Sequence, residues 1–271
     1  MKALRRLMRH RRGLINRKVV VIGVIVIALV IALRLFLSFI YVPPILMYHS
    51  IDIFSEITKL SVSPELFARQ MDFLYRHKYN VVSLGEMVNL IKSRKGIPPK
   101  TVTITFDDGY INNYDYAYPV LKKYGFPATF FIITSLIGKP AYLDWEQLKE
   151  LEKNNITIGS HTIDHQWLPN LSDKDLRREL FESKKVLEKH LNNGIKFVSY
   201  PIGAHDERVQ KVVKEAGYEG ACATNPGPDK RWDDIYALKR LRISRSSTNM
   251  FIFWIETSGY YTFIKEVRDE Q

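Results

Sequence analysis

The chain has 271 residues, of which 40 are Lys or Arg and 29 are Asp or Glu, so its formal net charge is +11. This charge is concentrated at the front. Residues 1–42 contain nine basic residues and no acid, which leaves 31 basic against 29 acidic residues in the rest. The rest is therefore close to neutral and has no basic stripe interleaved with aromatic residues, so we expect no nucleic-acid partner. The single cysteine, Cys222, excludes an intramolecular disulfide.

A long apolar segment near the N-terminus predicts a membrane anchor. It covers 24 residues, from Val19 to Val42, and that length can cross a bilayer core of about 30 Å. Arg34 lies toward its far end, where a long side chain can reach the headgroups. The basic cluster in residues 1–18 predicts a cytoplasmic N-terminus and a domain outside the cytoplasm. A cleaved signal peptide is the alternative, but no convincing small-x-small site follows the apolar run.

We therefore divide the chain into three parts: a basic cytoplasmic tail at 1–18, a single-pass anchor at 19–42 and a domain at 43–271. In the domain, apolar strands alternate with amphipathic helices. Strands are expected at 45–48, 81–82, 102–106, 128–133, 156–159, 197–200, 220–223 and 241–243. Helices are expected from Ser63-Pro64 onward and at 84–92, 114–123, 144–153, 172–191 and 206–216. This alternation predicts an α/β fold, a parallel (β/α) barrel of seven or eight strands with its chemistry at the carboxyl ends.

Polar residues follow three of these strands. Asp107 and Asp108 follow the strand at 102–106, His161 and His165 follow the strand at 156–159, and His49 follows the strand at 45–48. Adjacent carboxylates raise each other's pKa, so such a pair indicates metal binding, proton transfer or both. An Asp-Gly turn is the alternative interpretation.

The spacing of His161 and His165 indicates a metal site. Residues four apart on one helical turn share a side, and two imidazoles with one carboxylate make a three-ligand site open to water and substrate. One Asp would then bind the metal, and the other would stay off it to take a proton from the attacking water.

These residues also lie within motifs that resemble a known family. The segments TFDDGY at 105–110, SHTIDH at 160–165 and SYPIG at 199–203 resemble those of the NodB-type polysaccharide deacetylases, carbohydrate esterase family 4. The resemblance covers about residues 45–245 and implies a distorted (β/α) barrel that hydrolyses N-acetyl, and sometimes O-acetyl, groups on glycans. It implies that Asp107 is the general base, and that the metal ligands are Asp108, His161 and His165. It further suggests the backbone N–H of Tyr110 as an oxyanion donor.

Two departures from the family pattern have consequences. The usual histidine after the third motif is missing, because no histidine follows His205, whereas LMYH at 46–49 precedes TFDDGY. That order resembles the circularly permuted branch, which is similar to poly-N-acetylglucosamine deacetylases, and it makes His49 the expected acid for the leaving amine.

The second departure is the missing arginine of the third motif. Arg240 and Arg242, beside the last predicted strand, are candidates to replace it. We expect Tyr200 and Pro201 to shape a groove wall, with a plain turn as the alternative.

The expected function is metal-dependent hydrolysis of N-acetyl groups on an extracytoplasmic polysaccharide that contains N-acetylglucosamine. Zn²⁺ is the expected metal, with iron, cobalt or nickel as alternatives, because the ligand types suit all of them. The permuted order favours poly-N-acetylglucosamine over peptidoglycan and chitin-type oligomers. An O-acetyl esterase or an inactive glycan-binding protein is the alternative, although the intact set of five site residues argues against decay. No oligomeric state is predicted.

Overall fold

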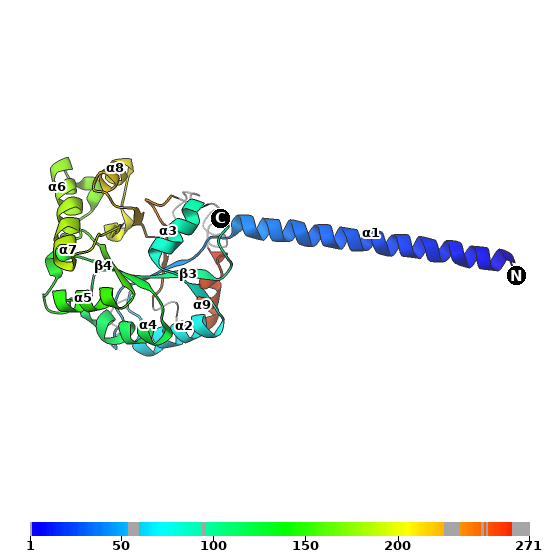
Figure 1. Ribbon diagram of the computed structural model, residues 1–271, viewed down its shortest axis with the longest axis horizontal. Coiled ribbons are helices and arrows are strands. Elements are labelled where there is room, and N and C mark those ends of the chain that lie inside the picture. Colours follow the sequence, from blue (N-terminus) through cyan, green and yellow to red (C-terminus); the bar gives the residue numbers. More distant parts are fainter. Residues whose placement is uncertain are drawn as a thin grey trace. The chain divides into compact units, whose positions relative to one another are not determined.

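The computed structural model describes residues 2–53, 60–93, 96–224, 234–244, 247 and 249–261. The chain forms two compact units, the first ending at Tyr41 and the second beginning at Val42. The first unit is a single helix, α1 (Lys2–Ile40), drawn in blue in Figure 1. Its segment Val19–Ser38 is long and apolar enough to cross a membrane, and none of it is buried.

The second unit is built on a curled sheet in which every strand pairing is parallel. The strands follow the order β7-β6-β5-β4-β3-β1-β8, and β2 pairs with β3 beside this path. The described strands are β1 (Ile45–Tyr48), β2 (Asn80–Val81), β3 (Thr101–Phe106), β4 (Ala128–Ile132), β5 (Ile156–Ser160), β6 (Phe197–Ser199), β7 (Gly220–Cys222) and β8 (Leu241–Arg242). The predicted α/β barrel class and its strand positions are thereby confirmed, with ends that differ by one or two residues.

The sheet is nearly closed by the segment that leads into β8. Leu238 pairs with Cys222 at the end of β7, and Leu241 and Arg242 pair with Leu46 and Met47 of β1. The chain therefore crosses from one edge of the sheet to the other within five residues, with Arg240 in the middle of the crossing.

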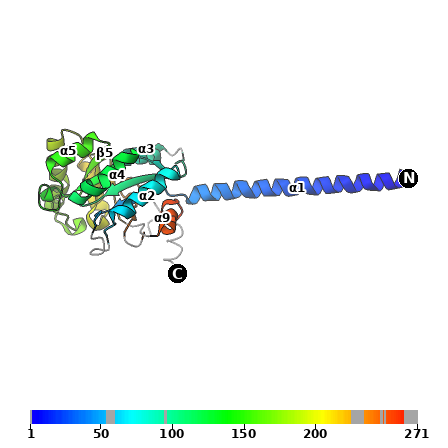
Figure 2. The same ribbon diagram turned by 90° about the horizontal axis from the view of Figure 1, so that it is seen from below.

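Helices connect the strands (Figures 1 and 2). The described helices of this unit are α2 (Pro64–Arg76), α3 (Leu84–Ser93), α4 (Tyr118–Tyr124), α5 (Trp145–Lys153), α6 (Asp173–Arg177), α7 (Ser183–Leu191), α8 (Glu207–Glu215) and α9 (Met250–Thr257). Ser63 caps α2, since its hydroxyl accepts the N–H of Leu66 at 3.2 Å. Helix α9 was not predicted from the sequence.

Two helices contain a wider, π-helical turn where the sequence predicts regular helix. One turn, Asn113–Ala117, precedes α4, and the other, Arg178–Glu182, joins α6 to α7. Such turns change the direction of the side chains that follow and are frequent at functional sites.

The period of two along the strands separates two buried layers. On β1 and β3 to β6, even-numbered residues such as Leu46, Tyr48 and Ile104 pack in the larger cluster with the helices. Odd-numbered residues such as Ile45 point to the opposite face, where they pack with Phe131 and helix α3. Polar residues at the carboxyl ends of the strands continue the odd-numbered face, and this places the candidate site.

Candidate active site

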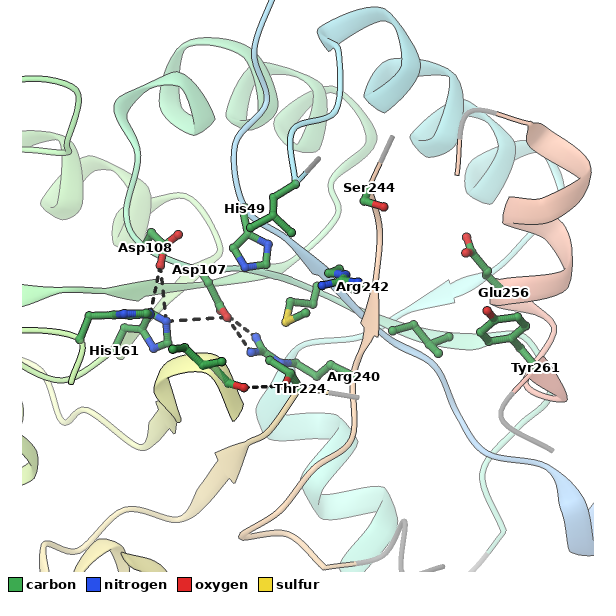
Figure 3. Close-up of a pocket in the computed structure, with 15 residues that line it drawn as sticks. His49, Asp107, Asp108, His161, Thr224, Arg240, Arg242, Ser244, Glu256 and Tyr261 are labelled. Atoms are coloured by element: carbon green, nitrogen blue, oxygen red, sulfur yellow. Dashed lines mark hydrogen bonds and ion pairs between the residues drawn. The ribbon is translucent and has the colours of Figure 1, made fainter. Parts of the chain in front are cut away.

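The alternation along β1 and β3 brings His49 and Asp107 to the same end of the barrel. Met47 pairs with Thr105, and the Asp107 N–H donates to the Tyr48 carbonyl at 3.0 Å, so His49 and Asp107 leave neighbouring strands together. Both line a cavity of about 480 Å³. Figure 3 shows His49, Asp107, Asp108 and His161 at one end of this cavity and Glu256 at the other.

Asp108, His161 and His165 form a three-ligand cluster, as the sequence predicts. Their candidate ligand atoms all lie within 4.8 Å of one another. The Asp108 Oδ1 is 3.5 Å from His161 Nε2 and 3.8 Å from His165 Nε2. One carboxylate oxygen and two imidazole nitrogens therefore face a common point.

The hydrogen bonding of His161 suits a metal ligand. Its Nδ1 donates to the Ser199 carbonyl at 2.8 Å, and because a carbonyl only accepts, the ring proton lies on Nδ1. The lone pair of Nε2 then faces Asp108. Burial lowers the pKa of His161 to about 4, against the opposing charge of Asp107, so the ring is neutral near pH 7. A neutral imidazole held by its second nitrogen is the usual form of a metal-ligating histidine.

Asp108 lies where its negative charge is unfavourable and where a bound cation would stabilise it. Burial, and then the charge of Asp107, raise the pKa of Asp108 above its usual value, with His49 and His165 opposing the shift. Its backbone is left-handed, with φ of 73°, and so is that of Gly109, with φ of 77°. A side chain at Gly109 would bring its Cβ to 3.1 Å from Ile132, so this turn requires glycine. The donor set and the charge at the site therefore fit a divalent cation.

Asp107 is held in a different environment from Asp108. Arg240 donates from Nη1 to Oδ1 at 2.7 Å and from Nη2 to Oδ2 at 2.6 Å, and the Ser199 hydroxyl donates to Oδ2 at 3.2 Å. Burial alone would raise the pKa of Asp107, but Arg240, with His161 and His49, holds it well below its usual range. Asp107 is therefore ionised and oriented by Arg240. Its Oδ2 also lies 3.9 Å from His161 Nε2, so Asp107 borders the three-ligand cluster, and Arg240 holds both of its oxygens.

Arg240 thus replaces the missing arginine of the third motif, for which the sequence offers Arg240 and Arg242 as candidates. Its side chain is fully buried, and it also donates to the Ala223 carbonyl at 2.9 Å and to the Thr105 hydroxyl at 3.1 Å. Arg242 lines the cavity but is exposed. The pairing of β8 with β1 decides between them, because it places Arg240 at the crossing inside the barrel.

The two metal-site histidines do not lie on a helical turn, which corrects the geometry predicted from their spacing. Residues 161–165 form a loop in which Thr162 and His165 have left-handed φ angles of 68° and 56°. The rings still meet, with centroids 4.7 Å apart. The loop geometry, rather than helical periodicity, brings them together.

A buried carboxylate that the sequence analysis missed supports this loop. Glu179 Oε2 accepts the backbone N–H groups of Ile163 at 2.8 Å and Asp164 at 2.9 Å. Glu179 comes from the π-helical turn before α7 and is fully buried. Asp164 itself pairs with Arg178 at 2.8 Å, so it faces away from the cluster as a loop support.

His49 is held through its backbone by the other π-helical turn. The side-chain amide of Asn113 donates to the His49 carbonyl at 2.7 Å and accepts the Ile51 N–H at 3.1 Å. His49 Nδ1 is buried with no hydrogen-bond partner among the described residues. Burial lowers the pKa of His49, while Asp107 and Asp108 act in the opposite direction.

The remaining predicted residues lie around this centre. Tyr110 is stacked on Tyr142, with ring centroids 5.3 Å apart. Tyr200 and Pro201 are buried and do not line the cavity, and the Tyr200 hydroxyl donates to the Tyr236 carbonyl at 2.8 Å. The adjacent Ile202, 61% exposed, lines the cavity wall in their place.

With this geometry in view, comparisons with known proteins identify the family. The family profile described as polysaccharide deacetylase matches residues 94–221. The Bacillus subtilis (strain 168) protein YxkH is 40% identical over 201 residues, which cover 74% of this chain and 71% of that protein. The chain belongs to the polysaccharide deacetylase family.

Two further relatives agree with this assignment. The Staphylococcus aureus (strain MSSA476) poly-beta-1,6-N-acetyl-D-glucosamine N-deacetylase is 33% identical over 176 residues, which cover 60% of each chain. The Streptococcus pyogenes deacetylase PplD, solved in complex with acetate, superposes with a TM-score of 0.71 at 30% identity, over 83% of this chain and 97% of that one. This polysaccharide deacetylase is therefore a hydrolase of the class that cleaves N-acetyl amide bonds.

Proposed function

We propose that this polysaccharide deacetylase removes N-acetyl groups from an N-acetylglucosamine polymer outside the cytoplasm, releasing acetate and a free amino sugar. One observation carries the proposal. The two adjacent aspartates have different main partners: Asp108 Oδ1 faces two imidazoles, and Asp107 is clamped by Arg240, with His161 Nε2 at 3.9 Å from its Oδ2. Hydrolysis of an amide by an activated water requires that division.

Asp108, His161 and His165 would hold a divalent metal ion. When bound, such an ion supplies a Lewis acid for the acetyl carbonyl and a water with a lowered pKa. Two imidazoles and one carboxylate suit Zn²⁺, and also iron, cobalt or nickel.

Asp107 acts as the general base. The buried Arg240 keeps its carboxylate ionised and fixes both oxygens, so it can accept the proton of the attacking water without rotating away. A low pKa makes a carboxylate a weaker base. The Asp107 carboxylate is nevertheless ionised at every working pH and already held in position, and this fixed orientation compensates for its weaker basicity.

His49 donates the proton that the departing nitrogen needs. It lies in the same cavity as Asp107, on the neighbouring strand. When the carbon–nitrogen bond breaks, the amine leaves as a neutral group only if it is protonated, because an amide anion is a poor leaving group. The backbone N–H of Tyr110 is the proposed second donor to the developing oxyanion.

The location of the enzyme follows from its front end. We propose that α1 anchors the chain in a membrane, with residues 1–18 in the cytoplasm and the catalytic unit outside. The length of the apolar segment Val19–Ser38 and the basic residues before it support this arrangement.

Acetate release from three polymers tests the substrate. We expect the purified full-length protein to release acetate from poly-β-1,6-N-acetylglucosamine faster than from peptidoglycan or chitin-type oligomers, and Asp107→Asn to abolish the release. Preferential release from an O-acetylated glycan that lacks N-acetyl groups would instead make the protein an esterase.

A further inference from the structure

Helix α9 has its polarity reversed relative to an ordinary surface helix. Its inward side carries Glu256, 6% exposed, beside the fully buried Phe253 and Thr257. Its outward side is apolar: Phe251 is 61% exposed, Trp254 48% and Ile252 39%. We call Phe251, Ile252 and Trp254 the α9 apolar face. An exposed patch of this kind on one short element usually marks an interaction site.

The buried side fixes this orientation. The Thr257 hydroxyl is 3.1 Å from that of Tyr79, the Ser247 hydroxyl donates to Glu256 at 3.2 Å, and Phe253 packs against Phe73 of α2 with ring centroids 5.8 Å apart. Figure 2 shows α9 lying beside α2. The helix therefore cannot rotate to hide its apolar face without breaking buried polar contacts.

A hydrogen bond connects the end of α9 to the start of the catalytic unit. The Val42 N–H donates to the Gly259 carbonyl at 2.8 Å. Val42 is two residues beyond Ile40, the last residue of α1. Two residues span at most roughly 7 Å of extended chain. Gly259, which lies two residues beyond the end of α9, is therefore hydrogen-bonded to the residue at which the chain continues from α1 into the catalytic unit.

We propose that the α9 apolar face lies in the interfacial layer of the membrane in which α1 is anchored. This inference rests on the proposed anchor. Aromatic side chains such as Trp254 favour the boundary between headgroups and acyl chains, and short helices with one apolar side bind there in the membrane plane. Three side chains alone would bind lipid weakly. The anchor, however, already holds the chain at the membrane, so the effective concentration of lipid is high and a weak affinity suffices.

The charge near the patch agrees with a lipid surface as the partner. Residues 251–255 contain no acidic side chain. Lipid headgroups with negative charge would therefore meet no carboxylate of this segment.

Docking of α9 would place the active site with respect to the membrane. Glu256, on the inward side of the same helix, lines the active-site cavity at the end away from the aspartates (Figure 3). One wall of the cavity would therefore lie within one helix thickness of the lipid. The polymer would then be deacetylated close to the membrane surface.

Nitroxide labels on the full-length protein in anionic lipid nanodiscs test the docking. The native Cys222 is fully buried, and burial raises the pKa of its thiol to about 12, so it competes poorly for the label. Labels are attached at Phe251→Cys and Trp254→Cys, at Ile27→Cys in α1, and at the exposed Lys189→Cys on α7, which Figure 1 places far from α9 within the unit. Collision rates with oxygen, which partitions into lipid, and with a water-soluble nickel chelate are compared.

The docking proposal predicts that labels at 251 and 254 collide several-fold more with oxygen and several-fold less with nickel than the label at 189. The docking would be overturned, and the anchor left intact, if the label at 27 lay in lipid while the labels at 251 and 254 were as accessible to nickel as the label at 189. Protection of 251 and 254 from both reagents would also overturn it, in favour of a second copy or the C-terminal tail. A label at 27 exposed to nickel would remove the anchor itself, and the docking with it.

Discussion

The two neighbouring aspartates show how environment divides one residue type into two roles. Arg240 and the Ser199 hydroxyl surround Asp107, whereas Asp108 turns through a left-handed backbone toward His161 and His165. Their pKa values move in opposite directions, that of Asp107 downward and that of Asp108 upward. The lowered pKa suits a carboxylate that stays ionised as a base, and the raised pKa of Asp108 indicates a position that a bound cation would stabilise.

The role of His49 as an acid predicts a dependence on the leaving group. His49→Gln should lower kcat for the N-acetyl substrate by about 10²–10⁴-fold, the usual contribution of a positioned proton donor. The same variant should hydrolyse an aryl acetate nearly as fast as the unaltered enzyme, because a phenolate leaves without a proton. The comparison needs only acetate release from the two substrates.

Asp107→Asn is the control for that experiment, since both substrates need the base and both rates should fall. If His49→Gln lost activity on the two substrates equally, His49 would have a structural role or a role in water activation, and the assignment as the acid would be wrong.

Arg240 is expected to matter for stability as well as for activity. Arg240→Met leaves the buried Asp107 carboxylate without its partner, and breaking a buried pair of this kind costs about 3–5 kcal/mol in the free energy of unfolding. Arg242→Met is the matched change at an exposed position of the same strand region and should cost little. Chemical denaturation measures the free energy of unfolding of both variants. Similar losses in the two would contradict the assignment of Arg240 as the partner that clamps Asp107.

At the level of elements, the two π-helical turns have a common task. Asn113 from one turn binds the backbone on either side of His49, and Glu179 from the other binds the loop that carries the metal-site histidines. Both side chains are fully buried. The scaffold therefore positions the proposed acid and the proposed metal-ligand loop through polar anchors behind each of them.

Glu179→Ala should weaken metal binding without touching a ligand. The substitution removes the acceptor for two backbone N–H groups of loop 161–165. Loss of such a support typically lowers metal affinity by about 10–100-fold, and we expect a decrease of that size here. Competitive titration with a chromophoric chelator measures the dissociation constant directly. Glu182→Ala, exposed on the same turn, is the control and should leave the affinity unchanged. Equal affinities in the two variants would argue against the support role.

Most elements could be predicted from the sequence, because strands buried on both faces and helices with one apolar side leave clear patterns. The clustering of Asp108, His161 and His165 was also predicted, since these residues follow β3 and β5, which only β4 separates in the sheet. The helical placement of the two histidines was wrong because left-handed residues, Thr162 among them, give no periodic signal.

The parts that the sequence did not reveal depend on long-range contacts. Glu179 falls within the predicted helix at 172–191, and only the wider turn directs its side chain inward. The choice of Arg240 over Arg242 required the register of β8 on β1. Helix α9 was missed because Phe251, Ile252 and Trp254 face outward while Glu256 faces inward, and this mixture gives no apolar side of the kind that predicts a surface helix.

For the whole molecule, a chain of buried polar groups joins α9 to the barrel. The Tyr48 hydroxyl donates to Gln70 at 2.9 Å, Gln70 donates to the Ser247 carbonyl at 3.3 Å, and the Ser247 hydroxyl donates to Glu256 at 3.2 Å. Glu256 Oε2 has no hydrogen-bond partner among the described residues. A buried carboxylate with one unsatisfied oxygen is a cost to stability when ionised.

That cost predicts how stability changes with pH. Burial raises the pKa of Glu256 to about 7, against the opposing hydrogen bond of Ser247. Between its ordinary value near 4.5 and about 7, the folded protein keeps a proton that the unfolded chain releases, so stability falls as pH rises through this window. Glu256→Gln should therefore be more stable than the unaltered protein at pH 8, by up to roughly 3 kcal/mol, and nearly equal to it at pH 4.

Thermal unfolding of the two proteins at several pH values measures this difference, with the exposed Glu182→Gln as the control. A Glu256→Gln variant that is destabilised equally at every pH would mean that Glu256 is ionised and satisfied in the folded protein.

The division of labour between Asp107 and Asp108 is the central claim, and metal content measured together with acetate release tests it most directly. The full-length protein, Asp107→Asn and Asp108→Asn are each analysed for bound metal and for activity on poly-β-1,6-N-acetylglucosamine, before and after chelation. We predict that Asp107→Asn keeps its metal and loses activity, that Asp108→Asn loses both, and that chelation inactivates the unaltered protein until metal is returned. Activity that survives chelation, or an Asp108→Asn protein with full metal content, would contradict the account.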